Sequence, residues 1–126
     1  ALTAQNTSAG TSANTAVGYQ AASGLTSATG VTAIGYKAGG NATLTGDNNT
    51  LIGRGAGFNL IEGVSNCIMG KDAGVGMTGA NNNIAIGLSA LATMVQGDNN
   101  TAIGHQALQV PQVPQLLVVG LWVVVL

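Results

Sequence analysis

The chain has 126 residues, of which only 6% are charged, and three Lys or Arg against four Asp or Glu give a net charge of -1. So few cations cannot neutralise a phosphate backbone, which excludes nucleic acid as a partner. Aromatic residues make up 3% and Gly fills 20 positions, so a core of large side chains is excluded, and 46% hydrophobic residues with two Pro argue against disorder.

Residues 1–11 are expected to form a partial N-terminal turn, and residues 12–109 carry an internal repeat. Six five-residue segments align, each ending in Gly, and their glycines lie 17, 18, 17, 17 and 17 residues apart. Ala stands three residues after each Gly, and the residue directly before each Gly is aliphatic or Met. The aligned segments are Asn14–Gly18, Val31–Gly35, Asn49–Gly53, Asn66–Gly70, Asn83–Gly87 and Asn100–Gly104.

Each segment is too short for a helix, and its Thr and Ile favour a strand with alternating faces. We therefore expect the residue before each Gly to point into the core: Val17, Ile34, Ile52, Met69, Ile86 and Ile103. The glycines are expected to form turns: Gly18, Gly35, Gly53, Gly70, Gly87 and Gly104. The alanines fit a tight corner or a close approach between chains: Ala21, Ala38, Ala56, Ala73, Ala90 and Ala107.

A unit of this length, holding two or three short strands, cannot bury its apolar face alone, whereas stacked units can. The repeat therefore predicts an all-β parallel β-solenoid of about six 17-residue turns; a helical solenoid is rejected, because helical repeats are longer and Gly is costly in them. The linkers before three of the strands, residues 46–49, 80–83 and 97–100, are turn-formers whose Asn side chains can bond along the axis. Because the core is thin, we also expect the chains to associate side by side.

The repeat stops near residue 109 and is followed by a Pro-containing linker at 110–115 and an apolar segment at 116–126. The apolar segment is too short to span a membrane as a helix, and a strand is expected there instead. Three interpretations stay open: a cap or chain-packing strand, a strand donated to a neighbouring subunit, and a truncated anchor.

No constellation for chemistry is visible, so no enzymatic activity, cofactor or metal is expected. Asp47 and Asp98 occupy the same linker position three turns apart, His105 has no partner in register, and Cys67 is expected to be a small buried residue. Calcium at the Gly-Asp-Asn-Asn linkers is a minor alternative to turn formation. The remaining ionisable residues are Lys37, Arg54, Glu62, Lys71 and Asp72.

The position after each Gly carries the most varied and bulkiest side chains. Stacked in register, they would form an outward column able to bind a glycan or a surface polymer; the alternative is a column that only solubilises the fold or packs on a neighbouring chain. Its members are Tyr19, Tyr36, Arg54, Lys71, Leu88 and His105.

The Val31–Gly35 segment and the string Asn-Thr-Ala-Ile-Gly-His-Gln-Ala at 100–107 resemble the head repeats of trimeric autotransporter adhesins. They are also similar to repeats of phage tail-fibre proteins. The resemblance covers residues 12–108, and the longer period here favours the fibre type. It implies a left-handed parallel β-roll, a side-by-side homotrimer and an extracellular location on a cell surface or virion.

The function expected from repeat and resemblance together is a structural, non-catalytic subunit of an extracellular trimeric fibre or adhesin head, used for attachment to a surface glycan or protein receptor. The alternative is a filament subunit linked end to end by its C-terminal strand. Ice binding is rejected, because Cys67 and Ile84 interrupt the Thr column of Thr15, Thr32, Thr50 and Thr101, and because alternation is expected to turn that column inward.

Overall fold

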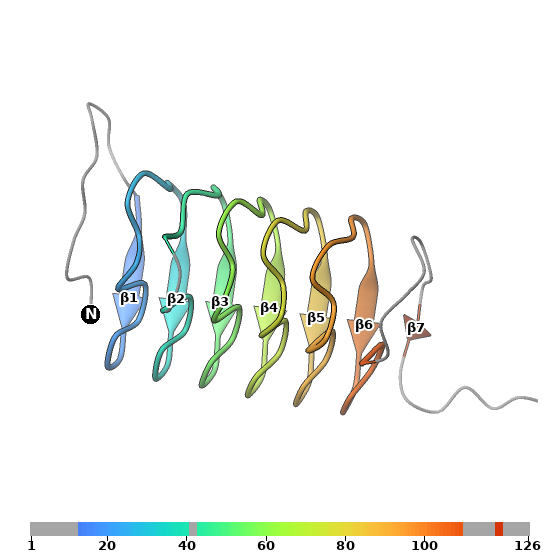
Figure 1. The fold of residues 1–126 in the computed structure, drawn as a ribbon. Helices are drawn as coiled ribbons and strands as arrows, with labels where there is room; N and C mark the ends of the chain where they lie inside the picture. The colour runs from blue at the N-terminus through green and yellow to red at the C-terminus, as the bar shows by residue number, and fades with distance from the viewer. Residues whose placement is uncertain (1–12, 41–42, 110–117, 120–126) are drawn as a thin grey trace, which may run out of the picture.

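The computed structural model describes residues 13–40, 43–109 and 118–119, so the expected N-terminal turn at 1–11 and the linker at 110–115 lie outside the described residues. The chain is a parallel β-solenoid in which each three-residue strand is followed by a turn and an irregular return segment (Figure 1). The six three-residue strands bound about five turns, one fewer than the six expected. The strands are β1 (Thr15–Val17), β2 (Thr32–Ile34), β3 (Thr50–Ile52), β4 (Cys67–Met69), β5 (Ile84–Ile86), β6 (Thr101–Ile103) and the two-residue β7 (Val118–Val119).

The strands pair in parallel and in sequence order, and equivalent repeat positions lie opposite one another. Thr15 pairs with Thr32, and Ile86 with Ile103. The 18-residue spacing of the second repeat leaves the register intact, since Ile34 still pairs with Ile52. The stacking predicted from the repeat is therefore confirmed.

Each coil contributes one strand, not the two or three expected. In the described part of the chain the only pairing outside the strands is a bridge between Leu25 and Leu44. The return segments cannot be extended, because residues such as Gln20 and Ala22 have φ angles of 52° and 49°. Their backbones still bond between coils: the Lys37 amide donates to the Tyr19 carbonyl at 2.8 Å.

The core choice made from the sequence is wrong. The middle residue of each strand points inward, and the residue before Gly points out: Ala33 and Ile68 are fully buried, whereas Val17 is 57% and Met69 39% exposed. Side chains alternate as expected, but the inward face is the one that carries Asn. The core is completed by the Ala residues three positions after Gly, all buried, and by larger side chains of the returns, such as Leu60 and Met77.

Buried asparagines explain why this face turns inward. Asn66 and Asn83 each donate their backbone amide to the Oδ1 atom of the Asn one coil earlier, at 3.0 and 2.9 Å. The Asn66 Nδ2 atom also donates to the Ala80 carbonyl at 2.8 Å. Thr or Ile on this face would leave these amides and carbonyls unpaired, which costs more than exposing aliphatic groups. The members of this Asn ladder are Asn49, Asn66, Asn83 and Asn100.

The six turn glycines have φ angles between 125° and 133°, as expected for turn residues. They also lie directly on one another. A Cβ atom on Gly70 would lie 2.4 Å from the carbonyl oxygen of Gly87 in the next coil. Gly is required at this position for space as well as for its backbone angle.

At the C-terminal end, Val118–Val119 forms β7 and pairs in parallel with β6, with Val119 opposite Ile103. The other residues of the expected 116–126 strand lie outside the described residues. Within the described ranges, no helix is long and apolar enough to cross a membrane.

Candidate functional site

The column after the turn glycines points away from the core. All six of its side chains are exposed, from Tyr19 at 64% to Leu88 at 42%. The turn Gly places this residue beyond the end of the sheet, where it starts the return segment. The residues lie in successive coils, so the column runs along the solenoid axis.

Three members of this column contact one another. The rings of Tyr19 and Tyr36 are stacked, with centroids 5.4 Å apart and planes 15° from parallel. The guanidinium carbon of Arg54 lies 5.8 Å from the centroid of the Tyr36 ring. A cation near a ring face is attracted by the ring quadrupole, so Tyr36 is held between an aromatic ring and a cation.

A second column, one residue further along, contains a gap that sequence reasoning missed. This position carries a side chain in five coils and Gly in the third: Gln20, Lys37, Gly55, Asp72, Ser89 and Gln106. The sequence does show one Gly among longer residues at this repeat position. That this Gly lies at a pocket depends on the side chains that surround it in the structure.

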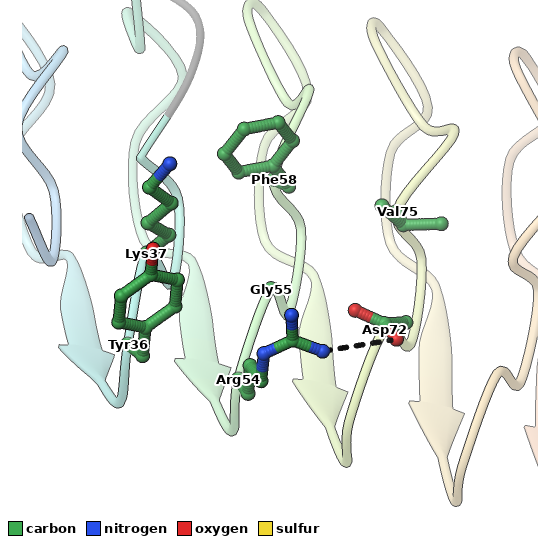
Figure 2. Close-up of a pocket in the computed structure, with 7 residues that line it drawn as sticks. All are labelled: Tyr36, Lys37, Arg54, Gly55, Phe58, Asp72 and Val75. Carbon is green, nitrogen blue, oxygen red and sulfur yellow. Dashed lines mark ion pairs between the residues drawn. The ribbon is translucent and has the colours of Figure 1, made fainter.

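A pocket of about 250 Å³ lies beside Gly55. Tyr36 and Lys37 come from one coil, Arg54 and Gly55 from the next, and Asp72 from the third (Figure 2). Phe58 and Val75, one from each of the last two coils, complete the lining.

The chain has three basic residues, Lys37, Arg54 and Lys71. Lys37 and Arg54 line this pocket, and Lys71 lies next to Asp72. The Lys37 ammonium lies 5.4 Å from the ring centroid of Tyr36 and 6.0 Å from that of Phe58.

One carboxylate faces these cations. Asp72 Oδ2 lies 4.0 Å from an Arg54 nitrogen and 3.8 Å from the Lys71 nitrogen. The Arg54 and Asp72 side chains are 60% and 37% exposed, so their contact is a weak surface pair. The site therefore has a surplus of positive charge.

The other ionisable residues considered from the sequence stay apart from this pocket. Asp47 Oδ1 accepts from the Thr29 amide at 2.7 Å, and Asp98 Oδ1 from the Asn81 amide at 2.8 Å, so both linker carboxylates tie one coil to another. His105 is exposed. Among the residues the structure describes, no three His, Cys, Asp or Glu gather as metal ligands would.

Two members of the expected binding column, Tyr36 and Arg54, line the pocket, and Tyr19, Lys71 and His105 do not. Cys67 lies on the outer face of the sheet and is half-buried, not sealed in the core. The Thr column also faces outward, contrary to the expectation, and Cys67 and Ile84 still interrupt it.

Comparison with known proteins gives no relative: no family model, no curated protein and no solved structure matches this chain.

Proposed function

We propose that the chain is a structural, non-catalytic segment of an extracellular trimeric fibre or adhesin head that serves attachment to a surface. The observation that carries the proposal is the apolar column on the outer face of the sheet, which we call the outer column. Its members are Val17, Ile34, Ile52, Met69, Ile86 and Ile103.

The outer column has the character of an interface between chains. Strands stack about 4.8 Å apart, so the column presents a continuous row of apolar side chains on the outer face of the sheet. Four of its members are among the exposed large hydrophobics of the chain: Val17, Ile34, Met69 and Ile103. Contiguous exposed apolar surface of this kind is typical of protein–protein contacts. Side-by-side packing would cover it and would widen a solenoid whose own interior is narrow.

The number of chains and the left-handed coil come from the resemblance to adhesin heads and tail fibres. A cyclic trimer turns the same face of every chain toward its threefold axis, which suits a solenoid that repeats one outer column along its length. A stiff shaft with 6% charged residues suits a load-bearing role outside the cell better than catalysis.

The decisive experiment is the mass of the particle in solution. We expect sedimentation equilibrium to give three chains for the unchanged protein, and Met69→Glu to give monomers, because three carboxylates would be buried near the axis. The matched control is Val64→Glu, an apolar residue of similar exposure (37%) that lies outside the strands. A stable monomer of the unchanged chain would contradict the proposal.

Cys67 offers a second readout of the same interface. It is the only Cys and stands in the outer face of β4, beside the outer column. We expect a thiol reagent to label it slowly in the assembled protein and rapidly in the Met69→Glu variant. Equal labelling rates in both would place the contact on another face.

The competing candidate is a filament subunit linked end to end by a donated C-terminal strand. Pairing of Val118–Val119 with β6 of the same chain occupies the edge that a donated strand would extend, which supports a capping role instead. Deletion of residues 115–126 separates the two: short soluble trimers in negative stain favour the cap, and loss of long filaments favours donation.

A further inference from the structure

We propose that the pocket above Gly55 binds one acidic sugar residue of a surface polysaccharide, through its carboxylate and its ring. This inference rests on the attachment function proposed above and names the ligand class for it.

The anion-binding group is Lys37. Its ammonium is held near two aromatic rings, Tyr36 and Phe58, and within the described part of the chain it forms no ion pair with a carboxylate. A cation whose position is restricted before binding loses less freedom when an anion arrives. Arg54 also lines the pocket, from the next coil, and its weak contact with Asp72 leaves guanidinium donors available.

The remaining walls suit a sugar ring more than a bare anion. Phe58 and Val75 offer apolar surface on one side of the pocket. The C–H groups of a pyranose carry partial positive charge and pack against the negative face of an aromatic ring such as Phe58. They also pack against an aliphatic side chain such as Val75. Asp72 reaches over the floor, since a Cβ atom on Gly55 would lie 2.6 Å from its Oδ1 atom. This carboxylate accepts hydrogen bonds from sugar hydroxyls and repels an inorganic anion that brings no donors.

Size and charge limit the ligand further. The pocket, at about 250 Å³, is smaller than the usual site for a drug-sized molecule and holds a single ring. Three basic residues are too few to follow a nucleic-acid backbone. The pocket adjoins the column that contains Tyr36 and Arg54, which runs along the solenoid axis. Neighbouring sugars of the same polysaccharide can therefore lie against the exposed side chains of this column.

The test uses the intact protein and titration calorimetry with an oligogalacturonate, and with its methyl ester as a matched uncharged ligand. We expect the acidic oligomer to bind and the ester to bind at least tenfold more weakly, since charged hydrogen bonds carry that difference. Equal affinity for both, or no binding of either, would overturn the inference. Inorganic phosphate that competes at the same concentration as the oligomer would show a plain anion site and would also overturn it.

Two variants locate the site. Gly55→Gln also moves the Asp72 carboxylate, because a Cβ atom at this position would lie 2.6 Å from the Asp72 Oδ1 atom. Lys37→Gln and Gly55→Gln introduce a residue that the same column already carries at Gln20 and Gln106, with φ angles of 52° and 57°. The first removes the cation and the second fills the pocket; each should lower the affinity about tenfold or more. Ser89→Gln adds the same side chain two coils away and should change nothing. Unaltered binding in both pocket variants would refute the assignment.

The two proposals fail separately. If the protein sediments as a trimer and does not bind the acidic oligomer, only the ligand assignment is lost. If it binds the oligomer as a monomer, the trimeric fibre is lost and the pocket remains.

Discussion

A Cβ atom on Gly57 would lie 2.8 Å from the Cδ2 atom of Leu51, so the absence of a side chain at one position makes room for a large one at the other. In the fifth coil the sizes are exchanged: Ala85 stands in the strand and Leu91 in the return, and both are buried. In the third to sixth coils one position of this pair is large and the other is small, so the two together fill the core there; the first two coils carry only small residues at both positions.

This exchange predicts a rescue. Leu51→Ala should lower the free energy of unfolding by about 2–5 kcal/mol, because it leaves a cavity in a dense core. Adding Gly57→Leu should recover about 1–2 kcal/mol: it refills the space, less the cost of a left-handed backbone. Leu91, with a φ of 52°, adopts that backbone already. Denaturant midpoints at equal protein concentration measure the effect, and a double variant no more stable than Leu51→Ala would contradict it.

The Asn ladder predicts a large cost for a small change. Asn83→Ala removes the Oδ1 atom that accepts from the Asn100 amide at 2.8 Å and the Nδ2 atom that donates to the Gly97 carbonyl at 2.8 Å. Each buried group left unpaired costs about 1–3 kcal/mol, so we expect a loss of about 3 kcal/mol or more. The control is Asn82→Ser, because Ser65 occupies the equivalent exposed position with a similar φ. Thermal unfolding of both variants decides; similar melting temperatures would show that the ladder adds little.

Because the turn glycines lie directly on one another, adding a single methyl group at one of them should push two coils apart. Gly70→Ala places Cβ against the Gly87 carbonyl and imposes a φ of 133° on an L-residue. Strain and overpacking together should cost about 3–5 kcal/mol. Hydrogen exchange should locate the damage at the amides of the adjoining turns.

A matched glycine serves as control for that variant. A Cβ on Gly79 meets only the Gln96 side chain, at 3.1 Å, which can move. Gly79→Ala is expected to change the unfolding free energy by less than about 1 kcal/mol. Equal losses in the two variants would remove the contact between glycines as the cause.

The linker aspartates are expected to act as hydrogen-bond acceptors between coils, with no need for calcium. Asp98→Asn keeps the Oδ1 acceptor for the Asn81 amide, as Asn81 itself does for the Val64 amide at 2.9 Å, and should be nearly neutral. Asp98→Ala should cost about 0.5–1 kcal/mol, since the bond is exposed. Calcium and EDTA should leave the melting temperature unchanged; a rise with calcium that Asp98→Asn abolishes would establish a metal site instead.

The sequence by itself determined the stacking and its register. A 17-residue period with Gly, Ala and an aliphatic residue at fixed places leaves little choice, because a one-residue shift would set side chains against the Gly70–Gly87 contact. Alternation along each strand followed from the same pattern.

Only the tertiary structure decided which face is inside. Hydrophobicity favoured Ile34 and Ile103 for the core. The interior is narrow, however, and the backbone amides and carbonyls at its corners need hydrogen-bond partners, which Asn side chains provide and Ile side chains cannot. The pocket above Gly55 also appears only in three dimensions, because its walls come from three coils. A repeat determines which residues become neighbours along the axis. Which side chains face them across the coil depends on the path that each return segment takes back to the next strand.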